Sequence, residues 1–130
     1  MPDNNLDNLR KSFPSLKIDG MIISHLPHIR LFTGFSGSNA LLAVTRTKGL
    51  LLTDSRYELQ VQREVQNVKV LVVGNGDFLE MLKKKSWFSG CRSVGFDRNR
   101  TSYHMATSLK KIIKPARLKP LSHVCETLAM

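Results

Sequence analysis

The chain has 130 residues, which is the size of one domain, and 42% of them are hydrophobic. Its longest apolar runs are far shorter than the roughly 20 residues of a membrane span, and its polar, acidic start lacks the pattern of a secretory signal. The formal net charge is +10, and residues 66–130 hold most of it, with twelve Lys and Arg against four Asp and Glu. We therefore expect one soluble domain, residues 1–130, in the cytoplasm.

The first elements predicted in chain order are a weak helix over 5–13, a buried strand over 17–24, and a β-hairpin of 40–45 and 50–53. Pro14 is expected to end the helix. Pro27 is expected to stop the strand, because proline cannot donate to a sheet. Gly49 closes the turn of the hairpin.

A capped helix is predicted directly after the hairpin. Asp54 and Ser55 stand where it begins, and Ser55 with Glu58 three residues later matches a capping box. Its buried face is predicted to hold Tyr57, Val61 and Val65.

The second half of the chain alternates strands with helices. The predicted order is a strand over 68–73, a helix from 77 to about 87, a strand over 93–96, a helix over 101–114, a strand over 117–121 and a helix after 122. A hairpin followed by this alternation predicts an α/β fold, with a mixed β-sheet flanked by helices.

Patterns for nucleophilic and nucleotide chemistry are incomplete. Residues 34–37 (GFSG) resemble a nucleophile elbow, but position 38 is Ser where that motif needs Gly, so Ser36 is not expected to act as a nucleophile. The glycines at 74 and 76 lack the third glycine of a dinucleotide fingerprint.

Metal and acid–base patterns are also weak. His25 and His28 flank Pro27, which would break a helix presenting both to a metal, and no acidic cluster accompanies them in the sequence. Acidic residues are scattered, so no close pair for general acid–base work is expected. Cys91 and Cys125 fit two reduced thiols. We predict no catalytic residue and no metal ligand.

The loop with Gly34 and Gly37 is the most unusual segment, because both glycines permit sharp turns and close backbone approach. One interpretation is a tight turn into the hairpin. The other is a loop that projects Phe35, Ser36 and Ser38 outward, toward a partner domain or substrate.

Arg56 stands in the first helical turn, where the helix dipole favours acids instead. It is either a surface arginine paired with Asp54 or Glu58, or a guanidinium aimed at a carboxylate of a substrate or another subunit.

Lysines and arginines gather in the second half, and this pattern fits either a solvated surface or a nucleic-acid footprint. They are residues 83–85 (KKK), Lys110, Lys111, Lys114, Arg117 and Lys119. No aromatic residue is interleaved with them for base stacking, so we favour the solvated surface.

Four segments together resemble one family. Residues 28–40 (HIRLFTGFSGSNA) and 53–57 (TDSRY) look like the paired signatures of the amino-terminal domain of the creatinase, prolidase and Xaa-Pro aminopeptidase family. Residues 94–97 (VGFD) and 118–121 (LKPL) match later positions in the same order. One departure is Ser55, where the family usually has glycine.

The resemblance implies a ribonuclease H-like α/β domain without catalytic residues. In this family a following carboxy-terminal pita-bread domain supplies two Asp, one His and two Glu to two divalent metals, commonly Mn, Co or Zn. That domain is absent from these 130 residues, so we expect the chain alone to be inactive and to hold no cofactor.

The resemblance also implies a supporting role, in which the domain builds oligomer contacts and walls the substrate cleft of a metallopeptidase that cleaves Xaa-Pro bonds. The residues expected in the cleft or interface are Arg30, Phe35, Ser36, Gly37, Ser38, Asp54, Arg56 and Tyr57. The expected partners are the catalytic domain of the same protein, further copies of the chain and, in the parent enzyme, a proline-containing peptide; no membrane is expected. The alternatives are the same domain of a creatinase-like amidinohydrolase, or a stand-alone interaction module that binds nucleic acid.

Overall fold

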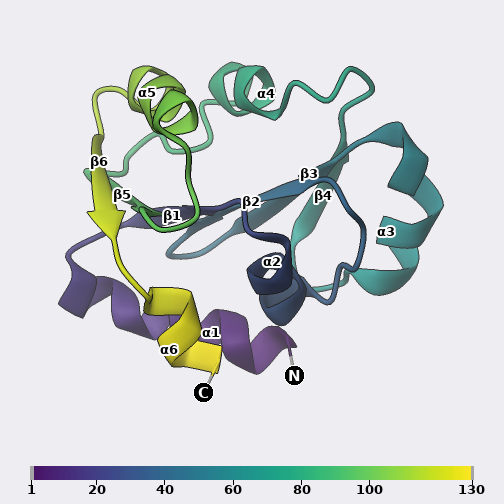
Figure 1. Cartoon of the computed structure of the whole chain (residues 1–130), viewed down its shortest axis with the longest axis horizontal. Coiled ribbons are helices and arrows are strands. Elements are labelled where there is room, and N and C mark those ends of the chain that lie inside the picture. The colour runs from purple at the N-terminus through teal and green to yellow at the C-terminus, as the bar shows by residue number, and fades with distance from the viewer. Residues whose placement is uncertain (1, 130) are drawn as a thin grey trace.

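The computed structural model describes residues 2–129 and contains a six-stranded sheet with helices on both faces (Figure 1). The strands are β1 (Gly20–Ile23), β2 (Ala40–Thr45), β3 (Gly49–Thr53), β4 (Lys69–Val72), β5 (Ser93–Asp97) and β6 (Arg117–Leu121). The helices are α1 (Pro2–Leu16), α2 (Leu26–Thr33), the 3₁₀-helix η1 (Ser55–Tyr57), α3 (Glu58–Glu64), α4 (Phe78–Lys84), α5 (Tyr103–Ile112) and α6 (Val124–Ala129). The predicted α/β class is confirmed.

The sheet is mixed, with strand order β4-β3-β2-β1-β5-β6. Strand β2 runs antiparallel to both β1 and β3, whereas the β3–β4, β1–β5 and β5–β6 pairs are parallel. Ala40 at the start of β2 lies opposite Thr53 at the end of β3. The predicted hairpin is therefore confirmed, and its register brings the loop before β2 next to the residues that follow β3.

Each face of the sheet has its own hydrophobic core. On one face lie α1, α2, α3 and α6, which bury Leu9, Phe32 and Val61 against the strands. On the other face, α4 and α5 bury Leu82 and Leu109. All six residues of β2 are buried, because both faces of this central strand are covered. Among the helices that the structure describes, none has the length and apolar character needed to span a membrane.

Two prolines behave differently from the sequence prediction. Pro14 does not end α1 but lies in its last turn, where its carbonyl accepts a hydrogen bond from the N–H of Lys17 at 3.1 Å. Helix α2 was not predicted, because Pro27 was interpreted only as the end of a strand. Pro27 in fact occupies the first turn of α2, where its missing N–H costs no helical hydrogen bond.

The predicted capping box at Ser55 is wrong. Asp54 is the N-cap of η1, and its side chain accepts the N–H of Arg56 at 3.0 Å. Ser55 is not among the non-glycine residues with positive φ. Serine is therefore unstrained at the position where the family pattern implied by the resemblance has glycine.

Candidate functional site

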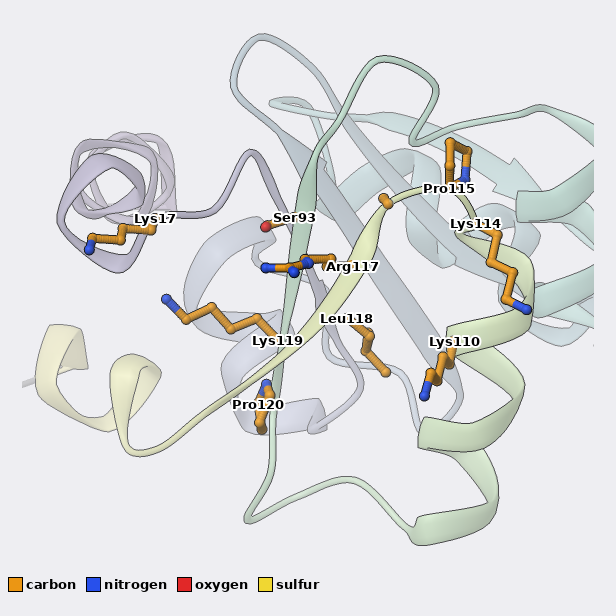
Figure 2. A pocket seen from close by; sticks show the side chains of 10 residues that line it. Lys17, Ser93, Lys110, Lys114, Pro115, Arg117, Leu118, Lys119 and Pro120 are labelled. Carbon is orange, nitrogen blue, oxygen red and sulfur yellow. The ribbon is translucent and has the colours of Figure 1, made fainter.

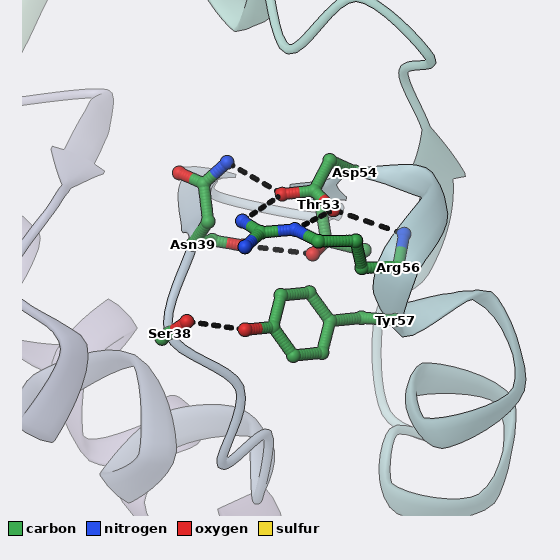
Figure 3. A network of polar contacts seen from close by, with 6 residues as sticks. All are labelled: Ser38, Asn39, Thr53, Asp54, Arg56 and Tyr57. Atoms are coloured by element: carbon green, nitrogen blue, oxygen red, sulfur yellow. Dashed lines mark hydrogen bonds and ion pairs between the residues drawn. The ribbon is translucent and has the colours of Figure 1, made fainter.

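The two sequence motifs meet at one end of the β2–β3 hairpin (Figure 3). The hydroxyl of Thr53 donates to the carbonyl of Asn39 at 2.7 Å, which fixes the end of the 34–39 loop against the end of β3. We call the polar cluster assembled here the hairpin-end site. It comprises Ser36, Ser38, Asn39, Asp54, Arg56, Tyr57, Gln60 and Glu64.

Asp54 is the centre of this site. Arg56 donates two parallel hydrogen bonds to its carboxylate, from Nε to Oδ1 at 3.0 Å and from Nη2 to Oδ2 at 2.8 Å. Asn39 adds a third donor, from Nδ2 to Oδ2 at 2.7 Å. A bidentate fork is the geometry in which guanidinium and carboxylate bind most strongly and with a defined orientation. The interpretation of Arg56 as paired with Asp54 is confirmed.

Asp54 and Arg56 each stabilise the charged form of the other. Hydrogen bonds from Arg56 and then Asn39 hold the pKa of Asp54 far below its ordinary value, and Asp54 in turn raises the pKa of Arg56. The Asp54 side chain is only 10% exposed, whereas that of Arg56 is 67% exposed. The guanidinium is thus anchored on one edge and open to solvent over much of its surface.

Tyr57 links the fork to the loop. Its hydroxyl forms a hydrogen bond with the Ser38 hydroxyl, which lowers the pKa of Tyr57. Its ring meets the Phe35 ring edge to face at 5.7 Å, and the Arg56 guanidinium lies 5.2 Å from the centre of the Tyr57 ring. Gly37 packs directly on Phe35, since a Cβ at position 37 would lie 2.3 Å from Phe35 Cζ. The loop therefore has one defined shape.

Ser36 is held by helix α3. Its N–H and hydroxyl donate to the two carboxylate oxygens of Glu64 at 2.9 and 2.7 Å, and Gln60 Nε2 donates to the Ser36 hydroxyl at 3.0 Å. Burial alone would raise the pKa of Glu64, but the bonds from Ser36 and Gln60 outweigh it and lower that pKa. Ser36 is both an acceptor and a donor in this network, and the lowered pKa of Glu64 makes that carboxylate a weak base toward the Ser36 hydroxyl.

The structure separates the predicted site residues into two groups. Ser36, Ser38 and Arg56 are exposed, and Tyr57 is half-buried. The prediction that Phe35 projects outward is wrong: it is 1% exposed and belongs to the core. Gly37 is buried as its support, Asp54 is buried as the anchor of the fork, and Arg30 is exposed on α2. Sequence reasoning missed Asn39, Gln60 and Glu64, and of these only Asn39 lies inside a quoted motif.

Four of the basic residues of the second half line a groove beside β6 (Figure 2). Lys110 and Lys114 reach it from the α5 side, Arg117 and Lys119 from β6, and Lys17 from the end of α1. None of its lining residues is aromatic. The groove has positive charge, but it lacks the stacking surface that single-stranded nucleic acid requires.

The sequence profile of the Creatinase/Prolidase N-terminal domain family matches residues 5–130, and the chain belongs to this family. This confirms the resemblance drawn from the sequence motifs.

Two curated relatives of this chain carry peptidase names. The chain is 30% identical over 125 residues to "Uncharacterized peptidase YqhT" of Bacillus subtilis, covering 96% of this chain and 35% of that protein. It is 30% identical over 100 residues to "Xaa-Pro aminopeptidase app-1" of Caenorhabditis elegans, covering 72% of this chain and 16% of that protein. The chain thus spans about a third of the first relative and a sixth of the second.

Solved structures share the fold. An Xaa-Pro dipeptidase from Bacillus anthracis superposes with a TM-score of 0.88 at 22% identity, over 98% of this chain and 36% of the other. The aminopeptidase P structure from Streptococcus thermophilus gives 0.86 at 26% identity, over 99% of this chain and 98% of the other. The N-terminal domain of the cytoplasmic peptidase PepQ from Mycobacterium tuberculosis gives 0.82 at 23% identity, over 96% and 98%. The matches favour neither alternative, the amidinohydrolase or the nucleic-acid module.

The metal pair implied by the family does not fit these residues. Within residues 2–129, one group of three possible ligands converges, formed by His28, Asp97 and Glu126. Two metals held by two Asp, one His and two Glu need five ligands, so three cannot build that centre. The hairpin-end site offers no alternative, because its carboxylates are occupied by Arg56, Asn39, Ser36 and Gln60.

Proposed function

We propose that this chain is the non-catalytic amino-terminal domain of an Xaa-Pro peptidase and that the hairpin-end site contacts the rest of that enzyme. The observation that carries the proposal is the Asp54–Arg56 fork, which fixes an exposed guanidinium on a rigid element. A side chain held in this way loses little conformational freedom when it binds. It is suited to contact a carboxylate of a catalytic domain, a neighbouring subunit or a peptide.

Ser36 and Ser38 extend the same surface. Both are exposed, and both are held by side chains of the η1–α3 segment, Glu64 and Tyr57. A partner that docks here meets a preformed array of hydroxyl and guanidinium groups instead of a mobile loop. We propose that this array forms part of the wall of the substrate cleft or an oligomer contact of the parent enzyme.

Catalysis in the parent would belong to a further domain. The chain spans 35% of its Bacillus subtilis relative, which leaves room in such proteins for a catalytic domain with two divalent metals. Peptides with proline in the second position would be its substrates, because app-1 and the solved relatives carry Xaa-Pro peptidase names. A cytoplasmic location is supported by the name of the PepQ relative.

The test compares two proteins, the 130-residue chain and the product of its full open reading frame, on an Xaa-Pro dipeptide and an Xaa-Pro-Pro tripeptide with added Mn²⁺. We expect hydrolysis by the longer product and none by the chain alone. Manganese-dependent hydrolysis by the 130 residues alone would overturn the proposal.

The role of the hairpin-end site is tested in the longer product with Arg56→Gln. We expect a several-fold rise in KM or a weaker subunit association, with the fold retained. Arg63→Gln, which removes an exposed arginine of α3 outside the fork, is the matched control and should change neither. Equal behaviour of both variants would refute a contact role for Arg56.

A further inference from the structure

A second polar cluster lies where α2, β5 and α6 come together. His28 belongs to α2, Asp97 ends β5 and Glu126 belongs to α6, and one ligand atom from each lies within 4.8 Å of the others. His28 and Asp97 are each only 7% exposed. We call these three residues the His28 cluster. Sequence reasoning did not find it, because its members are 69 and 29 residues apart along the chain.

Several polar atoms of the His28 cluster are buried without a hydrogen-bond partner among the described residues. They are His28 Nδ1, Asp97 Oδ2 and Glu126 Oε2. Asp97 Oδ1, by contrast, accepts the N–H of Asn99 at 2.9 Å. Buried polar atoms in folded proteins are paired in the great majority of cases, and an unpaired carboxylate oxygen is costly. Two such oxygens beside an imidazole mark a position that a cation would stabilise.

One imidazole–carboxylate spacing in the cluster suits a small divalent ion. His28 Nε2 lies 3.6 Å from Glu126 Oε1, and these are the second atoms of the two groups whose Nδ1 and Oε2 have no partner among the described residues. Two ligands of tetrahedral zinc, each about 2.0–2.1 Å from the metal, are about 3.4 Å apart. The widest separation in the cluster, up to 4.8 Å, exceeds this spacing, so metal binding would require the two carboxylate side chains to rotate toward His28. One imidazole nitrogen with two carboxylate oxygens is a donor set for a borderline transition metal rather than for Ca²⁺ or Mg²⁺.

We propose that His28, Asp97 and Glu126 bind one divalent transition-metal cation of the zinc class. The ion would join α6 to α2 and to the end of β5, and three protein ligands would leave the fourth tetrahedral position open to water. All three proposed ligands belong to this domain. This site goes beyond the proposed function and does not depend on it.

One positively charged side chain, that of Arg100, lies at the edge of the cluster. Arg100 Nε lies 3.7 Å from Glu126 Oε1, and the Arg100 side chain is 46% exposed. The distance exceeds that of a hydrogen bond, so Arg100 offsets part of the negative charge without satisfying the buried oxygens. Metal binding requires Arg100 to turn into solvent, and it is exposed enough to do so. Removing its charge should strengthen metal binding.

The experiment titrates Zn²⁺ by calorimetry into the metal-free 130-residue chain, with Mg²⁺ as the comparison ion. We expect one Zn²⁺ per chain, with a dissociation constant at least tenfold lower than that for Mg²⁺. His28→Gln and Asp97→Asn should each weaken Zn²⁺ binding at least tenfold. His104→Gln, which removes an exposed imidazole of α5, is the matched control and should leave it unchanged.

Further measurements keep the result decisive. Asp97→Asn retains an oxygen that can accept the Asn99 N–H. If Asp97→Asn fails to fold, Glu126→Gln is tested in its place. Co²⁺ in place of Zn²⁺ should show ligand-field bands without a thiolate charge-transfer band, because the three converging ligands include no cysteine. Arg100→Gln should bind Zn²⁺ more tightly. The proposal is overturned by absent binding, by binding that persists in the ligand variants, by loss in His104→Gln, or by a thiolate band.

Discussion

The hairpin-end site and the His28 cluster both bring carboxylates and cationic or basic groups together, but they differ in how the carboxylates are satisfied. In the first, Asp54 receives four hydrogen bonds from Arg56 and Asn39. In the second, Asp97 and Glu126 keep buried oxygens without a partner among the described residues. The first site is complete as protein alone. The second has the composition of a site that needs a ligand.

The difference follows from where the partners lie in the chain. Arg56 is two residues from Asp54, and Asn39 faces it across a hairpin, so these contacts form with the local structure. The His28 cluster forms only when α6 packs against the sheet through α1 and α2. A contact that depends on the last element has less local support, and it gains more from a bound ion.

The largest expected effect tests the packing beneath the complete site. Phe35→Ala removes a fully buried ring that supports both Gly37 and Tyr57. We expect the free energy of unfolding to fall by about 3–5 kcal/mol, as for other buried aromatic truncations. Urea denaturation measures it. Leu59→Ala, at a position 74% exposed, should change it by less than about 0.5 kcal/mol.

Matched Asp→Asn substitutions compare the two carboxylates directly. Asp54→Asn loses the charge that Arg56 and Asn39 bind, so the midpoint of thermal unfolding should fall by a few degrees. Asp97→Asn removes a buried charge of which one oxygen, Oδ2, has no partner among the described residues, and it keeps the bond from Asn99, so in metal-free solution the midpoint should stay or rise. A larger loss at position 97 than at position 54 would break the comparison.

Acid should lower the free energy of unfolding in part by protonating Asp54 in the hairpin-end site. The pKa of Asp54 is lowered in the folded state, so below about pH 3.9, its ordinary value, the unfolded chain binds more protons. The stabilisation from Asp54 is full above that pH and is lost as the pH falls toward the folded pKa. Urea denaturation between about pH 5 and about pH 2 should show a shallower loss for Asp54→Asn than for the unsubstituted chain. Asp7→Asn, on the exposed side of α1, should retain the slope.

The smallest expected effect concerns the departure from the family pattern. Ser55 has no positive φ, so the family's usual glycine offers no relief of strain. Ser55→Gly should lower the free energy of unfolding by about 0.5–1 kcal/mol, because glycine loses more backbone entropy on folding. Ser55→Ala removes the hydroxyl without the extra backbone freedom of glycine, so comparing the two variants separates the entropy effect from the loss of the hydroxyl. A gain in stability with Ser55→Gly would show that the turn is strained.

Sequence patterns predicted the sheet well, because the central strands β1, β2 and β3 carry continuous apolar runs. Strand β6, with Arg117, Lys119 and Pro120, is the exception. Sequence patterns missed α2, since its first-turn Pro27 and short apolar stripe look like an interrupted strand. At the hairpin-end site, Asp54 with Arg56 was within reach of sequence reasoning because the pair is local. Glu64 was not, because its contact with Ser36 spans 28 residues and depends on how α3 folds back.

Strand β6 is an edge strand of the sheet, and the basic groove lies along it. The N–H of Arg117 and the carbonyl of Leu121 bond toward β5, so the backbone of Leu118 and Pro120 faces outward. Pro120 has no N–H to offer there, and Arg117 and Lys119 place positive charge along the same strand. A second copy of the sheet would meet a missing donor and like charges at this edge. These features of β6 therefore disfavour edge-to-edge strand addition at this edge of the sheet, and concentrated solutions should stay free of β-sheet aggregates that grow from β6.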